Sequence, residues 1–160
     1  MIYSSIGYYA LIFGLAISFP IFFFSIKNFR DNKILDSKII SFSFIQMILV
    51  IVSFLGLIVS FILSDFSNET VFNNSHTTKP LFYKISGTWG NHEGSLLLWL
   101  LVLTLFIFIF LITSKNLLKN YRILTVLFQQ IIIIGFFIFL IDTSNPFNHV
   151  FPIPIEGLGL

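Results

Sequence analysis

The chain has 160 residues, of which 56% are hydrophobic, 22 are phenylalanine and only 10% are charged. A water-exposed domain usually carries about 25% charged residues, so this composition excludes a soluble protein and favours one embedded in lipid. The length excludes a large multidomain enzyme. The absence of cysteine excludes disulfides, iron–sulfur clusters and thiol chemistry. The net charge of +2 comes from basic residues that do not cluster beside aromatic side chains, so nucleic acid is not expected as a partner.

Four uncharged stretches lie between the charged segments, at residues 1–26, 39–64, 94–114 and 123–141. Each is apolar on every side and long enough to cross a bilayer core of about 30 Å as a helix. We therefore predict an all-α integral membrane protein, a single module over residues 1–160 with about four transmembrane helices at roughly 4–26, 39–64, 94–114 and 123–141. The first stretch lacks a basic residue before its apolar core, which favours a retained helix over a signal peptide. Pro20 is expected to bend or loosen its last turns.

The connections between these stretches differ in charge. The first and third carry seven of the nine basic residues: Lys27, Arg30, Lys33, Lys38, Lys115, Lys119 and Arg122. Such short basic connections face the cytoplasm or the mitochondrial matrix. Both termini, the connection at 65–93 and the tail at 142–160 are therefore expected on the outer face, periplasmic or intermembrane-space. The Asn/Ser/Thr-rich residues 67–78 are typical of an exposed loop.

The unusual polar residues gather where the third helix is expected to begin, in the sequence WGNHEGSLLLW. The candidate site residues in it are Trp89, Gly90, Asn91, His92, Glu93, Gly94, Ser95 and Trp99. If the helix begins near Gly90, then Trp89, His92 and Trp99 share one face. Gly90 and Gly94, four residues apart, would let another backbone or a flat ligand come close. Glu93 is favoured at a helix N-terminus by the dipole alone.

Several enzyme classes are excluded at this segment. The second histidine that a zinc peptidase needs after His92-Glu93 falls on Leu96, and Ser95 lacks the second glycine of a nucleophile elbow. One histidine with distant carboxylates does not make a metal site, so no metal is expected. His76 and His149 are expected to be solvated loop residues. Tryptophans that anchor a helix at the membrane interface explain part of the pattern, but not the crowding of Gly, Asn, His and Ser.

At these residues the sequence closely resembles the signature of CcmF, the haem lyase subunit of the multi-component cytochrome c maturation system. Three other segments agree with that family in the same order: PLFYK at 80–84, TSNPF at 143–147 and PIEG at 154–157. The second of these supplies a secondary outer-face motif of Asn145, Pro146 and Phe147. The resemblance covers essentially the whole chain, but only the N-terminal portion of the family's protein.

The resemblance implies a role in covalent attachment of haem to the Cys-x-x-Cys-His motif of apocytochrome c on the outer face of an energy-converting membrane. It also implies a CcmE-type haem chaperone and a CcmH-type protein as partners, beside membrane lipid. The family's tryptophan-rich segment and haem-ligating histidines lie beyond the matched portion, so none of these ligands is carried over. Haem is expected to be handled by the complete complex, with the catalytic residues unknown and the isolated chain not catalytically complete.

The resemblance further suggests a split gene product, in which the remaining chains complete CcmF in the mitochondrial inner membrane or, alternatively, the bacterial inner membrane. Four glycines are expected to pack against those chains: Gly56, Gly90, Gly94 and Gly135. An alternative stays open, a purely structural assembly subunit of a respiratory or transport complex. An ion carrier is disfavoured, because the interiors of the four predicted helices hold no ionisable residue.

Overall fold

The computed structural model describes residues 1–31 and 37–159, which form helices and connecting segments without a β-strand. Four long helices are each apolar enough to cross a membrane: α1 (Ile2–Arg30), α2 (Ser37–Ile62), α5 (His92–Thr113) and α6 (Lys119–Asp142). The all-α fold with four such helices is thus confirmed. Their ends lie within a few residues of the predicted boundaries, and α1 continues through Pro20 without interruption.

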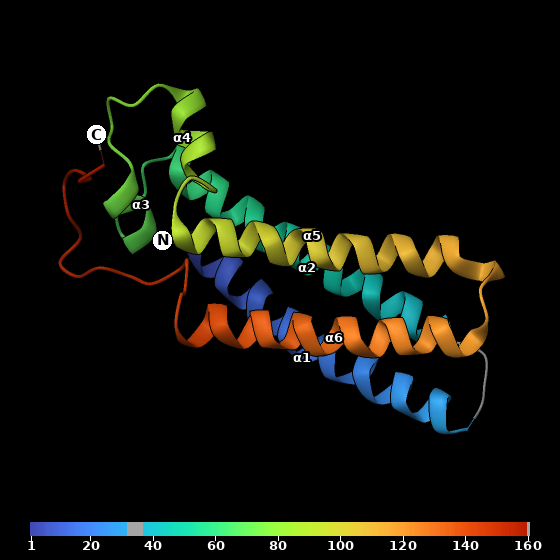
Figure 1. Cartoon of the computed structure of the whole chain (residues 1–160). Helices are drawn as coiled ribbons and strands as arrows, with labels where there is room; N and C mark the ends of the chain where they lie inside the picture. Colours follow the sequence, from blue (N-terminus) through green and yellow to red (C-terminus); the bar gives the residue numbers. More distant parts are fainter. Residues whose placement is uncertain (32–36, 160) are drawn as a thin grey trace.

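The four long helices form a bundle in which consecutive helices run in opposite directions (Figure 1). α1 packs on α2 and α6, and α5 completes the ring by packing on the same two helices. Large apolar side chains point outward from this ring, as on Phe13, Phe106 and Phe128, each at least 60% exposed. Such a surface matches hydrocarbon rather than water.

The two ends of the bundle differ in composition. One end carries the N-terminus, the C-terminal tail and two short helices, α3 (Glu69–Asn74) and α4 (Leu81–Gly87) (Figure 1). We call residues 65–91 and 143–159 at this end the headpiece. The opposite end holds the described basic residues of the first and third connections, while Lys33 lies outside the described residues.

The prediction of an exposed loop over residues 67–78 is wrong in part. Residues 69–74 form α3, and Asn68, Val71 and Ser75 have no exposed surface, whereas Thr77 and Thr78 are exposed. The short helix is stabilised by contacts with the tail, because the Leu158 amide donates to the Phe72 carbonyl at 2.8 Å. A helix of six residues is not stable on its own. Its polar composition predicted a loop because the contacts that stabilise it come from the tail, far along the sequence.

Two of the glycines expected to bind further helices are instead used within this chain. A Cβ added at Gly56 would lie 2.9 Å from the Tyr3 carbonyl oxygen, so Gly56 permits close packing of α2 on α1. A Cβ at Gly94 would overlap the Thr88 carbonyl oxygen. Gly90 is exposed beside the Ser86 carbonyl of its own segment. Of these four glycines, Gly135 alone faces open space, with no atom of the described part of the chain within 4 Å of an added Cβ.

Polar side chains connect the helices at two depths. In the middle of the bundle, Gln46 donates to Ser18 at 2.6 Å, and Gln130 donates to Gln46 at 3.1 Å, all three being fully buried. At the basic end, Arg122 is also buried and donates to the Leu111 carbonyl and the Ser114 hydroxyl, each at 2.9 Å. It thereby satisfies a carbonyl in the last turn of α5, which has no partner within the helix.

Candidate functional site

The start of α5 is held by Asn91, which is the N-cap of the helix. Its side-chain oxygen accepts from the Gly94 amide at 2.8 Å, and its nitrogen donates to the carbonyls of Gly87 at 2.7 Å and Thr88 at 3.1 Å. One carboxamide therefore satisfies an amide of α5 and fixes the α4–α5 connection above it. Asn91 is a structural residue of the motif.

Gly94 and Ser95 also have local structural roles. The Thr88 carbonyl occupies the space where a side chain at position 94 would lie, so only glycine allows the connection to fold back on the helix. The Ser95 hydroxyl donates to the His92 carbonyl at 2.8 Å. The crowding of small and polar residues at this helix start is thus largely explained by how the chain enters α5.

The tryptophans of the motif do not share one helical face as expected. α5 begins at His92, so Trp89 lies before the helix, stacked on Phe54 at a ring-centroid distance of 6.5 Å. Trp99 lies within α5 and is 60% exposed on the bundle surface. The two rings therefore occupy different surfaces, and each is amphipathic enough for a membrane interface.

His92 and Glu93 are the first two residues of α5. His92 is exposed and forms a hydrogen bond between its Nδ1 and the Ser144 hydroxyl at 2.9 Å, which joins the start of α5 to the segment after α6. Glu93 is half-buried beside it. Both side chains line a cavity of about 470 Å³ in the headpiece.

This headpiece cavity is lined by polar residues from α3, from the start of α5 and from the segment after α6. They are Glu69, Thr70, Asn73, Asn74, Asn91, His92, Glu93, Thr143, Ser144, Asn145 and Asn148. A porphyrin is a broad apolar ring and needs mostly apolar walls. The cavity as this chain forms it does not fit haem, and its carboxamides and carboxylates suit a polar or cationic group instead. Among the described residues no group of three or more acidic or histidine side chains could hold a metal ion.

The secondary motif at 145–147 packs against α1. Pro146 and Phe147 are buried, and the Phe147 ring fills the space beside Gly7 of α1. Asn145 accepts from the Phe147 amide at 2.9 Å through its side-chain oxygen. This turn therefore anchors the segment after α6 to α1, while Asn145 also borders the headpiece cavity.

Asn68 connects these parts, although it lies outside the sequence motifs that predicted the site. Its side-chain nitrogen donates to the Ser4 hydroxyl and the Pro146 carbonyl, both at 2.9 Å, and its oxygen accepts from the Val71 amide at 3.1 Å. Asn68 thus caps α3 and ties it to α1 and to the tail. An asparagine followed by Glu69 and an apolar Val71 is a helix-start signal that could have identified it.

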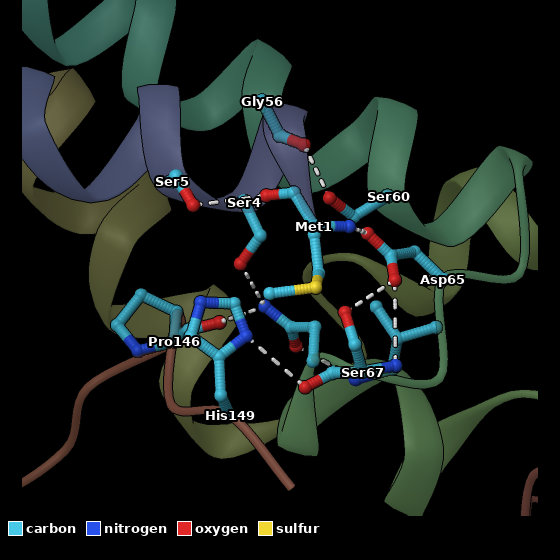
Figure 2. Close-up of polar contacts among 11 residues, drawn as sticks. Met1, Ser4, Ser5, Gly56, Ser60, Asp65, Ser67, Pro146 and His149 are labelled. Atoms are coloured by element: carbon cyan, nitrogen blue, oxygen red, sulfur yellow. Dashed lines mark hydrogen bonds and ion pairs between the residues drawn. The ribbon is translucent and has the colours of Figure 1, made fainter. Parts of the chain in front are cut away.

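Backbone pairing extends this connection along the tail. The Glu69 amide donates to the Asn148 carbonyl at 2.8 Å, and the Val150 amide donates to the Ser67 carbonyl at 3.0 Å. His149 donates from Nδ1 to the same Ser67 carbonyl at 3.2 Å (Figure 2). His149 is exposed and lies outside the headpiece cavity.

Two carboxylates outside the cavity stabilise the headpiece. The N-terminal ammonium group forms an ion pair with Asp65 (Figure 2). Partial burial raises the pKa of Asp65, but hydrogen bonds from the ammonium group and from Ser67 lower it more, so the pKa lies below the usual 3.8. Glu156 accepts from the hydroxyl and the amide of Thr77, which hold its pKa below the usual 4.5. His76 lies 3.7 Å from Glu156 and is half-buried, not simply solvated.

The fold and sequence of this chain match known proteins over nearly its whole length. No family model matches it. CycK of Bradyrhizobium diazoefficiens, a cytochrome c-type biogenesis protein, is 40% identical over 156 residues, covering 96% of this chain and 24% of CycK. CcmF of Haemophilus influenzae is 34% identical over 159 residues, covering 98% of this chain and 24% of CcmF. The chain corresponds to the N-terminal quarter of the CcmF family.

A solved structure agrees on the fold of this CcmF-type region. A cytochrome c haem lyase CcmF matches with a TM-score of 0.79 and 22% identity, over 91% of this chain and 25% of that protein. The region therefore spans about a quarter of the length of the relatives it matches. The resemblance inferred from WGNHEGSLLLW and its flanking segments is confirmed, for this N-terminal part.

Proposed function

We propose that the chain works in cytochrome c biogenesis as the N-terminal part of a CcmF-type haem lyase, whose remaining portion supplies the haem ligands. In this proposal it provides membrane scaffold and a polar vestibule, the headpiece cavity, rather than a complete active site. The main support is that the matching segments at 80–84, 89–99, 143–147 and 154–157 all belong to one headpiece or border it.

The headpiece would face outward from the membrane, into the periplasm or intermembrane space. The described basic residues of the first and third connections lie at the opposite end of the bundle, which supports this orientation. The bacterial relatives favour the bacterial inner membrane, and the mitochondrial inner membrane predicted from the split product is the second possibility.

The vestibule would meet a polypeptide rather than the porphyrin ring. Glu93 and His92 line it, although His92 also hydrogen-bonds to Ser144, and its carboxamides can bind a peptide backbone. Apocytochrome c, a CcmH-type protein and a CcmE-type chaperone are the partners to which we assign this face. Haem would be held by other chains of the complex.

The test replaces vestibule residues one at a time and measures covalent haem on cytochrome c, at equal abundance of the chain. His92→Ala and Glu93→Gln should lower covalent haem by roughly tenfold, the size of one lost interaction of about 1.4 kcal/mol, with the fold unchanged. His149→Ala is the matched control, since it removes an exposed histidine with one hydrogen bond outside the vestibule.

Asn91→Ala supplies a contrasting result. Because Asn91 caps α5, its loss should lower the free energy of unfolding by about 1 kcal/mol and reduce chain abundance, with any effect on haem following abundance. Unchanged covalent haem in both His92→Ala and Glu93→Gln would reject the proposal. That result would favour a purely structural subunit, an alternative that the structural roles of several motif residues support.

A further inference from the structure

An apolar groove runs between α5 and α6 on the surface of the bundle. It has a volume of about 430 Å³ and is lined by Leu96, Ile132, Gly135, Phe136 and Phe139. All five positions lie on the two long helices, within the part of the bundle that would be in the membrane. No polar side chain lines the groove.

Gly135 lines this groove and is not required for close packing among the described residues. At other glycines of the long helices, this chain itself occupies the space beside the glycine. Gly14 faces the Phe137 ring, and Gly56 faces the backbone of α1. At Gly135 an added Cβ meets no atom of residues 1–31 or 37–159 within 4 Å. Glycine in a helix costs about 1 kcal/mol relative to alanine, so a position facing only lipid would be better filled by a larger apolar residue.

A glycine under an open apolar groove is what close packing of another transmembrane helix requires. Association of helices in lipid depends on small residues that let backbones approach and on van der Waals contact. Lipid chains adapt to many surfaces and require no such position. The relatives are about four times as long as the matched region, so a CcmF-type complex contains further membrane segments that must pack on some face of this bundle.

The position of the groove favours this face. Leu96 follows Glu93 by one turn on α5, and Phe139 precedes Thr143 by one turn at the end of α6, and both Glu93 and Thr143 line the vestibule. A helix seated in the groove would therefore end beside the vestibule. There it could bring further residues to the polar cavity that this chain leaves incomplete.

We propose that the α5–α6 groove binds a transmembrane helix from the portion of the CcmF-type protein beyond the matched quarter. Gly135 is the point of closest approach. The inference rests on the proposed function, because it takes this chain to work together with that portion. It identifies the partner's chemistry as one apolar membrane helix and the contact as van der Waals packing.

The direct test is photo-cross-linking in native membranes with benzoylphenylalanine incorporated at Ile132. The expected adduct, identified by mass spectrometry, contains a peptide from a membrane helix of the CcmF portion beyond the matched quarter. Adding Gly135→Leu should lower the yield of this adduct about tenfold, because the leucine fills the groove. Ala16→Leu is the control, since Ala16 is a small exposed residue on α1, and it should leave the yield unchanged.

Other results would overturn the inference. An adduct with lipid alone, with a second copy of this chain or with a protein outside the CcmF family would do so, as would a yield that Gly135→Leu does not change. The covalent-haem assay separates the two proposals. If His92→Ala loses covalent haem and position 132 gives an adduct with lipid alone, only the proposed helix binding at the groove is rejected. Unchanged covalent haem in both vestibule variants rejects the proposed function.

Discussion

Individual polar side chains hold the headpiece together, and Asn68 is the clearest case. It is fully buried and connects α1, α3 and the tail through three side-chain hydrogen bonds. Replacing it leaves the Ser4 hydroxyl, the Pro146 carbonyl and the Val71 amide each without this partner. Unsatisfied groups of this kind are costly when buried.

Asn68→Ala should therefore lower the free energy of unfolding by roughly 2 to 3 kcal/mol, from a lost N-cap of about 1 kcal/mol and buried groups left unpaired. The measurement is unfolding of the purified chain in detergent micelles. Asn73→Ala serves as control, because Asn73 lies exposed on the same helix and should change stability by less than about 0.5 kcal/mol. Equal effects of the two substitutions would contradict the role of Asn68.

The ion pair of Asp65 gives the headpiece a predictable response to acid. Its pKa in the folded protein lies below the usual value of 3.8, so the folded state binds the proton less readily than the unfolded state. The stabilisation is complete above pH 3.8 and is lost as the pH falls through the folded pKa. Asp65→Asn should be less stable than the natural chain at pH 6, and the difference should shrink below pH 3.8. Melting curves across this range measure it, and a gap that stays constant with pH would refute the assignment.

Residue roles within the motif could be predicted only in part. Trp, Gly, Asn, His and Glu at one helix start indicated a site, but which of them serve structure depends on atoms that meet in space. Asn91 reaches back to the Gly87 carbonyl, and Gly94 leaves room for Thr88. Neither contact has a sequence signal beyond a glycine and an asparagine near a helix start.

At the scale of elements, the buried glutamines connect α2 and α6, and Gln46 extends the network to Ser18 of α1. Hydrogen bonds between helices in membranes contribute about 0.6 kcal/mol on average and up to about 2 kcal/mol. Since Gln46 and Gln130 bond to each other, their contributions should not add.

A double-mutant cycle tests this coupling. Gln46→Leu and Gln130→Leu should each destabilise the bundle by about 1 kcal/mol, and the double variant should cost less than the sum. Gln129→Leu is the matched control, because Gln129 is the neighbouring glutamine and is only half-buried. Strict additivity in the cycle would contradict a shared hydrogen bond.

The elements differ in how far the sequence predicts them. The four long helices could be predicted because lipid demands continuous apolar segments with internally satisfied backbones. α3 and α4 could not, because helices of six and seven residues are too short for a periodic pattern and depend on tertiary contacts. Their location within a polar connection made a loop the natural prediction.

At the scale of the whole molecule, the chain divides into a membrane bundle and a polar headpiece on one end. The bundle carries the apolar α5–α6 groove with its open glycine, and the headpiece carries the polar cavity with His92 and Glu93. We assign the groove to a membrane helix and the cavity to a polypeptide partner. Neither, by the residues described, forms a haem pocket.

The central claim is that this chain is a partner-dependent scaffold of a haem lyase. The most direct measurement is the haem absorption spectrum of the purified chain, recorded alone and after purification together with its membrane partners. We predict no stoichiometric haem on the chain alone, and haem only in the larger complex. Stoichiometric haem on the isolated chain would contradict the account.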